Sequence, residues 1–181
     1  MVEPTHGDLE ANGIAIHYAE AGDGPLVVFC HGWPESWYSW RHQLPAVAEA
    51  GYRAVALSMR GYGQSGAPQD IGAYSIMHLI GDVVGAVNGL GESSAVVVGH
   101  DWGAPVAWYS ALTRPDMFRA VACLSVPLTP AIGELPEGMK AALDDLRHLD
   151  IVDGAGHWLQ QERPGLVNTA LIEFLDGLGD R

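Results

Sequence analysis

The stretch "GHDWGAPVAW", residues 99–108, follows an apolar run and opens a helix-like segment. Gly99, Gly103 and Ala104 are small, as a sharp turn from strand to helix requires if it is to expose the side chain at its centre. The spacing is that of a nucleophile elbow, and the central residue is Asp101. A glycine-bounded turn with an acidic residue near a helix N-terminus explains the same residues without chemistry. The surrounding sequence has to decide between these two interpretations.

Apolar and helical segments alternate along the chain on both sides of this stretch. Runs rich in Val, Ile and Phe and bounded by Gly or Pro are typical of strands covered on both faces. We expect strands at residues 13–22, 25–30, 52–59, 93–99, 118–126 and 148–152. We expect helices at residues 36–50, 75–90, 137–146 and 164–178. Strands that alternate with helices predict an α/β fold, a mainly parallel sheet with helices on both faces.

Composition narrows the classes of protein and partner. A chain of 181 residues that is 48% hydrophobic supports one domain with a sizeable core. A formal net charge of −13 argues against nucleic acid and membrane surfaces as partners. Cys30 and Cys123 lie in apolar runs, which favours buried free thiols over a disulfide or a metal site. The first 13 residues lack the pattern of a secretory signal, so we expect a cytoplasmic protein.

Chemistry in such a sheet belongs to loops at the carboxyl ends of the strands. Four loops fit that position, at residues 31–34, 60–66, 99–104 and 154–158. The second contains "GYGQSG" (61–66), which matches the dinucleotide pattern G-x-G-x-x-G. Residues 67–70 continue the loop where that pattern needs a helix, so we interpret it as a structural turn.

Two of the other loops supply partners for the elbow. "HGWP" (31–34) ends a buried strand, where an oxyanion-hole amide lies in folds with such an elbow. "GAGHW" (154–158) places His157 beyond the last expected strand, where the catalytic base belongs. The order of nucleophile and then histidine along the chain also fits. Together these loops favour the chemical interpretation of Asp101.

The chain resembles the epoxide hydrolase family of the α/β-hydrolase fold, whose members combine H-G-x-P, R-G-Y-G-x-S and G-H-D-W-G. These motifs occur here as "HGWP" (31–34), "RGYGQS" (60–65) and "GHDWGA" (99–104). "GHWLQQERP" (156–164) is similar to the segment around the family's catalytic histidine. The resemblance runs almost continuously over residues 1–127 and resumes near Glu137. It implies conversion of a small apolar epoxide to a vicinal diol with no metal and no cofactor.

An aspartate nucleophile has a chemical reason. A serine that attacked an sp³ carbon would leave an ether, whereas a carboxylate leaves an ester that water can cleave. The resemblance implies that Asp101 opens the epoxide and that His157 activates the water that hydrolyses the ester. It also implies that the Trp33 and Trp102 amides stabilise the oxyanion.

The other residues of these loops have structural roles in this interpretation. We expect His100 to be a packed histidine and not a second base. The residues expected to shape the loops are His31, Gly32, Pro34, Gly99 and Gly103.

The sequence departs from the family in two places. Relatives carry a helical cap with two proton-donating tyrosines, but every tyrosine here lies at or before Tyr109. Relatives also carry an acid, commonly in a Gly-x-x-Asp context, where "PAIGELPEG" (130–138) has Pro136. By position, Glu134 is the best substitute for orienting His157. Asp144 and Asp145 fit a solvated helix face instead.

We therefore expect residues 1–181 to form one α/β-hydrolase core domain without a cap, with an apparent internal deletion between about 127 and 137. The deletion fits either a shortened hydrolase or a longer protein whose internal segment is absent from this sequence. We expect epoxide hydrolysis at a reduced rate. Two alternatives stay open: a haloalkane dehalogenase, in which Trp102 would donate to the halide, and a non-catalytic hydrolase-like domain. Self-association as a homo-oligomer is also left open.

Overall fold

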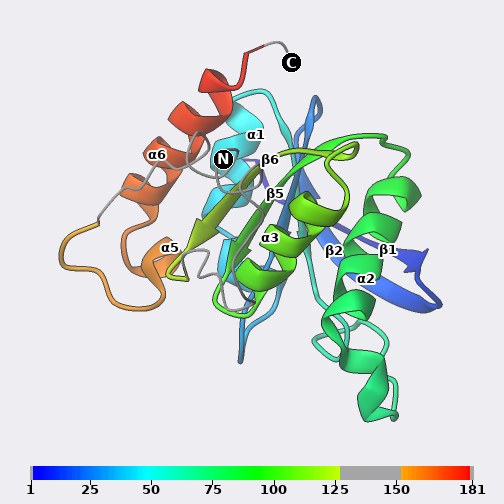
Figure 1. The fold of residues 1–181 in the computed structure, drawn as a ribbon. Helices are drawn as coiled ribbons and strands as arrows, with labels where there is room; N and C mark the ends of the chain where they lie inside the picture. Colours follow the sequence, from blue (N-terminus) through cyan, green and yellow to red (C-terminus); the bar gives the residue numbers. More distant parts are fainter. Residues whose placement is uncertain (1, 127–151, 180–181) are drawn as a thin grey trace, which may run out of the picture.

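The computed structural model describes residues 2–126 and 152–179, and six strands of that part of the chain form one sheet (Figure 1). Their order across the sheet is β1-β2-β4-β3-β5-β6. The strands are β1 (Thr5–Ala11), β2 (Ile14–Ala21), β3 (Leu26–Cys30), β4 (Arg53–Leu57), β5 (Ala95–His100) and β6 (Phe118–Leu124). β4, β3, β5 and β6 are parallel, whereas β1 and β2 join the β4 edge antiparallel. The expected mainly parallel sheet is confirmed.

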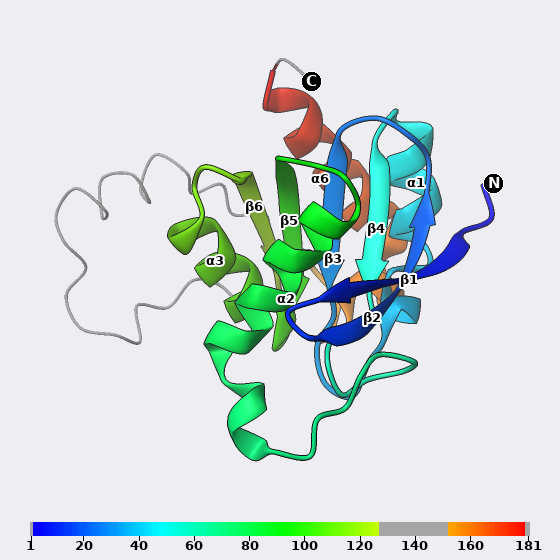
Figure 2. The same cartoon turned by 90° about the vertical axis from the view of Figure 1, so that its right-hand side faces the viewer.

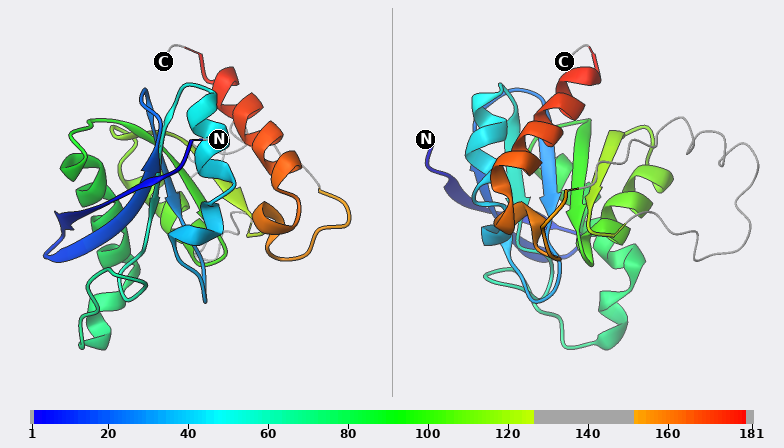
Figure 3. Two further views of the ribbon diagram at one scale, coloured as in Figure 1. Left: turned by 180° about the vertical axis from the view of Figure 1, so that it is seen from behind. Right: turned by 90° about the vertical axis from the view of Figure 1, so that its left-hand side faces the viewer.

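Helices cover both faces of the sheet, as expected (Figures 2 and 3). Helices α2 (Ile76–Gly89) and α3 (Gly103–Thr113) pack on one face. Helices α1 (Gln43–Glu49) and α6 (Pro164–Gly177) pack on the other. All five residues of β3 are buried because successive side chains enter opposite cores. The remaining short elements are η1 (Trp37–Trp40), η2 (Ile71–Tyr74) and α5 (Leu159–Glu162).

The strand order creates a topological switch point at the carboxyl ends of β3 and β5. From β3 the chain crosses to β4 on one side, and it then returns to place β5 on the other side of β3. The loops that leave β3 and β5 therefore diverge, and ligands bind at such switch points in open α/β sheets. Cys30, the last residue of β3, pairs in register with Gly99 of β5. This register brings the loops at 31–34 and 99–104 together.

One expected helix needs correction, one strand was not expected, and two expected elements lie wholly or mostly outside the described residues. The helix expected at 36–50 is divided into η1 and α1. Strand β1 was not expected at all. The helix expected at 137–146 lies outside the described residues, as does most of the strand expected at 148–152.

Other local expectations are confirmed. The "GYGQSG" segment closes as a turn, in which the Gly61 amide donates to the Gly66 carbonyl at 2.9 Å. Cys30 and Cys123 are free, as expected, but only Cys30 is buried, whereas Cys123 is partly exposed. Burial raises the pKa of the Cys30 thiol to about 12, so this thiol is inert. Among the helices of the described residues, none has the length and apolar character needed to cross a membrane.

Candidate active site

Asp101 occupies the sharp turn between β5 and α3. Its φ of +51° lies in the left-handed region, which is uncommon for a residue with a side chain. The turn needs glycine on both sides. A Cβ on Gly99 would overlap the Gly103 carbonyl, and a Cβ on Gly103 would overlap the carbonyls of Cys30 and His31. The elbow geometry expected from the sequence is therefore present.

The two oxygens of the Asp101 carboxylate have different partners. The Trp33 amide donates to Oδ1 at 2.8 Å. The His157 ring nitrogen Nε2 lies 3.1 Å from Oδ2. The Asp101 side chain is 20% exposed and that of His157 is 41% exposed, so water can reach the pair. One oxygen is thus held by a backbone donor, and the other faces a potential base.

The loop at residues 31–34, which we call the oxyanion loop, approaches Asp101 closely. Only glycine fits at position 32, because a Cβ there would overlap Cβ and Oδ1 of Asp101. His31, the first residue of this loop, is buried. Pro34, the last, is exposed and follows a cis peptide bond. Within the described residues, the Trp102 amide makes no hydrogen bond to Asp101 that matches that of Trp33. Its role in an oxyanion hole stays a prediction.

The loop at residues 154–158, which we call the base loop, is held through its backbone. The His157 carbonyl accepts from Ser125 Oγ at 2.6 Å and from His100 Nε2 at 2.7 Å. The Glu162 carboxylate accepts from the Gly156 amide at 2.8 Å and from the Trp158 amide at 3.2 Å. These four hydrogen bonds fix the position of the backbone from which the His157 side chain projects.

His100 and Glu35 form a buried pair between the two loops. His100 is fully buried, and its Nδ1 lies 3.2 Å from the Glu35 carboxylate. His100 is a packed residue, as expected, and its Nε2 donates to the His157 carbonyl. That it does not act as a second base stays a prediction. The Gly32 amide donates to Glu35 Oε2 at 3.1 Å. Glu35 therefore connects the oxyanion loop with the base loop through His100.

The charge of Glu35 is maintained by its donors. Burial pushes the pKa of Glu35 upward, but hydrogen bonds from His100, Gly32 and Ser39 outweigh burial and lower that pKa. The sequence analysis assigned no role to Glu35, Ser125 or Glu162. An acidic residue directly after "HGWP" is the one signal that could have indicated Glu35, because carboxylates commonly accept from loop amides.

The remaining expected site residues fall into two groups. Trp33 and Trp102 expose most of their indole rings beside Asp101. Glu134, the expected orienting acid, lies outside the described residues, as do Asp144 and Asp145. In the part of the chain that the structure describes, Asp101 and His157 come together. The acid that would orient His157 stays a prediction.

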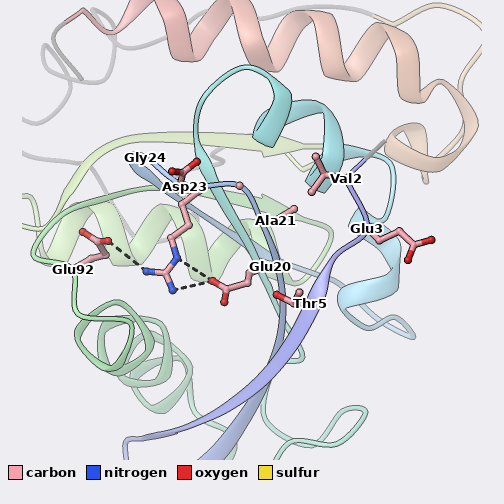
Figure 4. Close-up of a pocket in the computed structure, with 10 residues that line it drawn as sticks. Val2, Glu3, Thr5, Glu20, Ala21, Asp23, Gly24 and Glu92 are labelled. Atoms are coloured by element: carbon pink, nitrogen blue, oxygen red, sulfur yellow. Dashed lines mark hydrogen bonds and ion pairs between the residues drawn. The ribbon is translucent and has the colours of Figure 1, made fainter.

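A separate hollow of about 410 Å³ lies at the opposite, amino-terminal end of the parallel strands (Figure 4). Arg53 dominates it and donates to Glu20 at 2.9 Å and to the Leu90 carbonyl at 3.1 Å. Glu92 lies 3.5 Å from the same guanidinium. These charged groups satisfy one another, and the hollow is remote from Asp101. The site at the carboxyl edge is where the chemistry of the fold belongs.

Comparison with known proteins places this geometry in context. A family model described as the alpha/beta hydrolase fold matches residues 25–148. An epoxide hydrolase of Caballeronia sordidicola is 56% identical over 120 residues, which cover 66% of this chain and 36% of the relative. A bifunctional epoxide hydrolase 2 of Sus scrofa is 50% identical over 164 residues, 91% of this chain and 28% of the relative.

Solved structures of proteins named epoxide hydrolases are also similar to this chain. The crystal structure of an epoxide hydrolase from Vigna radiata superposes with a TM-score of 0.70 at 50% sequence identity. The match covers 78% of this chain and 46% of that one. In each of these three comparisons, the chain spans less than half the length of its relative.

Proposed function

The chain belongs to the alpha/beta hydrolase fold family, and from this premise we propose that it is an epoxide hydrolase that forms an ester on Asp101. One observation carries the proposal. The Asp101 carboxylate lies between the Trp33 amide at Oδ1 and His157 Nε2 at Oδ2. The similarity to proteins named epoxide hydrolases supports it. A carboxylate nucleophile suits an alkylatable carbon, because the resulting ester can be hydrolysed.

In the first half-reaction, Oδ2 is the oxygen that attacks. Oδ1 is held by the Trp33 backbone amide, whereas the partner of Oδ2 is a side chain, that of His157. The Oδ2 lone pair forms a bond to an epoxide carbon, and the carbon–oxygen bond of the ring breaks. The electron pair passes to the ring oxygen, which takes a proton from a donor or from water. The product is a hydroxyalkyl ester of Asp101.

In the second half-reaction, His157 Nε2 takes a proton from water, and the water oxygen attacks Cγ of Asp101. Negative charge then develops on Oδ1, where the Trp33 amide donates. A preorganised donor of this kind contributes about 3–4 kcal/mol in measured cases. The Cγ–Oδ2 bond breaks, and the departing alkoxide takes the proton from His157. The diol leaves, and Asp101 retains the oxygen that came from water. The second proton of that water passes from the new carboxylic acid to the deprotonated donor or hydroxide left by the first half-reaction, which restores the Asp101 carboxylate.

We also propose that the rate is reduced in this chain, which we interpret as one domain shortened between about residues 127 and 137. The sequence has no tyrosine after Tyr109 to protonate the ring oxygen. A positioned general acid contributes about 10²–10⁴-fold. Glu134 is the candidate to orient His157.

A paired assay tests the function and separates it from the alternatives. The chain is incubated with styrene oxide or with 1-bromobutane, and diol and bromide are measured beside the Asp101→Asn control. Diol without bromide, absent from the control, supports epoxide hydrolysis. Bromide release would instead indicate a dehalogenase. With neither product, and with no mass adduct on Asp101, the domain would be non-catalytic.

A further inference from the structure

The oxyanion loop contains a buried titratable side chain that the proposed reaction does not use. His31 is only 1% exposed, and both of its ring nitrogens have backbone partners. Nε2 lies 3.0 Å from the Met59 amide nitrogen. Nδ1 lies 2.8 Å from the Gly32 carbonyl oxygen. His31 thus bridges the loop that follows β4 and the peptide that approaches Asp101.

These partners determine the tautomer of His31. A backbone N–H can only donate, so Nε2 must accept from Met59 and carries no proton. A carbonyl oxygen can only accept, so Nδ1 carries the proton and donates to Gly32. Burial lowers the pKa of His31 and outweighs the bond to Gly32 and the charge of Glu35, which raise it. The neutral Nδ1–H form therefore fits both contacts.

The carbonyl that His31 contacts belongs to the same rigid unit as the oxyanion donor. The Gly32 C=O and the Trp33 N–H are the two ends of one planar peptide group. His31 holds the carbonyl end at 2.8 Å, and Asp101 Oδ1 accepts from the amide end at 2.8 Å. A bond at the carbonyl fixes the rotation of the plane. It also polarises the N–H, because chains of hydrogen bonds strengthen one another.

We propose that His31 is a positioning residue for the oxyanion-binding amide, acting through the Gly32–Trp33 peptide in the Nδ1–H tautomer. This inference rests on the proposed function of Asp101. It assigns the two ring nitrogens different roles. Nδ1 orients the Trp33 amide through the Gly32 carbonyl, and Nε2 only holds the ring against the Met59 amide.

Two variants separate these tasks. The amide nitrogen of asparagine lies where Nδ1 lies relative to Cβ, so His31→Asn retains a donor to Gly32 and loses the Met59 contact. The side-chain oxygen of glutamine reaches as far as Nε2, so His31→Gln retains the Met59 contact and loses the donor to Gly32. Each variant removes one buried hydrogen bond, and we expect their thermal midpoints to fall by similar amounts.

The first readout does not require turnover. In the ¹H–¹⁵N spectrum of the chain, we expect the Trp33 amide, which donates to the Asp101 carboxylate, to resonate downfield of ordinary backbone amides. We expect His31→Asn to keep this shift and His31→Gln to lose it, while amides remote from the loop stay in place in both. Equal changes of the Trp33 amide in the two variants, or its retention in His31→Gln, would overturn the inference.

The second readout follows the ester. After a pulse of styrene oxide, intact mass measures the decay of the Asp101 adduct. We expect the adduct of His31→Asn to decay at least about 10-fold faster than that of His31→Gln, since loss of one oxyanion donor slows hydrolysis by about 10²–10³-fold. Equal decay rates would contradict the inference. If the wild-type chain forms neither an adduct nor diol, the proposed function fails, and the Trp33 amide shift still decides the role of His31.

Discussion

The two carboxylate oxygens of Asp101 have different partners, and the backbone of Asp101 determines which oxygen meets which partner. The positive φ of 51° turns the side chain out of the β5–α3 path, so that Oδ1 meets the Trp33 amide and Oδ2 meets His157. Strain of this kind persists only where surrounding residues determine the conformation. Here the determinants are the missing side chains of Gly99, Gly103 and Gly32.

The substitution His157→Gln should separate the two half-reactions. Attack by Asp101 needs no base, whereas ester hydrolysis needs one. We expect a stable mass increase on Asp101 after incubation with styrene oxide, and diol formation reduced by about 10²–10⁴-fold. The double variant Asp101→Asn/His157→Gln is the control and should show no adduct. Turnover by His157→Gln at the wild-type rate would remove His157 from its assigned role.

Residue types at this site were predictable where a motif fixes the backbone, and not where a contact depends on tertiary structure. Asp101, His157 and Trp33 were expected from three loops and come together. Ser125 donates to the His157 carbonyl of the distant base loop, and Glu35 reaches that loop only through the side chain of His100. No spacing in the sequence encodes such contacts, because they arise only when folding brings the loops after β3 and β5 together.

The elements around the site were predictable in proportion to their burial. β3 and β5 are buried at every position and were expected as continuous apolar runs. β1 was missed because it is an edge strand whose sequence, Thr5–Ala11, is mostly polar and exposed. An edge strand needs little apolar pattern, since it packs against one neighbour only. The helix expected at 36–50 is divided because the tertiary contacts of Trp40 override local propensity.

The contact between α3 and β3 should be intolerant of a single methyl group. A Cβ on Gly103 would overlap the carbonyls of Cys30 and His31, which are backbone atoms that cannot move aside cheaply. We expect Gly103→Ala to lower the free energy of unfolding by about 1–3 kcal/mol, measured by urea denaturation. Gly165→Ala is the matched control, because Gly165 lies in α6 with open space around it. It should be neutral or stabilise by up to about 1 kcal/mol. Equal effects would contradict the close approach.

A buried ion pair connects the loop after β4 to α2. Arg60 Nε donates to Asp82 Oδ2 at 2.6 Å, a second guanidinium nitrogen reaches Oδ1, and both side chains are at most 5% exposed. Removing one charge leaves the other buried and unpaired. We expect Asp82→Asn to lower the free energy of unfolding by about 3–5 kcal/mol. The exposed pair Arg114–Asp116 supplies the control, and Asp116→Asn should change stability far less. Similar losses in the two variants would show that burial of the Arg60 pair does not matter.

For the whole molecule, buried neutral histidines predict acid sensitivity. Burial is the main cause that lowers the pKa of His17 and of His31, with His6 also lowering that of His17 and Asp8 opposing it. Their folded pKa values lie below 6.5, so below about pH 6.5 the unfolded chain binds more protons than the folded one. The free energy of unfolding should then fall by up to about 1.4 kcal/mol per pH unit for each histidine.

Urea denaturation at pH 7.5, 6.5 and 5.5 measures this slope. The lowered pKa of Glu35 acts in a different window, because its stabilisation is present above its unfolded pKa of 4.5 and is lost only as pH falls through its lower folded value. The variant His17→Gln should remove one histidine's share of the slope between pH 6.5 and 5.5. A slope that this variant leaves unchanged would contradict the assignment to His17.

Protonation of the ring oxygen and enclosure of the site both bear on the rate of this chain. Opening an epoxide develops negative charge on the ring oxygen, and no tyrosine follows Tyr109 to protonate it. Asp101 and His157 are also 20% and 41% exposed, so water screens the interactions that a closed site would strengthen. We expect a version with a tyrosine-bearing cap and a strand–acid segment inserted between Val126 and Glu137 to form diol about 10²–10⁴-fold faster than the 181-residue chain.

Initial rates of diol formation with styrene oxide measure the ratio, and the same insertion in Asp101→Asn controls for activity that the insert brings by itself. If the two chains turn over equally fast, then Glu134 or another group already supplies the acid and the orientation, and the proposal of reduced activity is wrong.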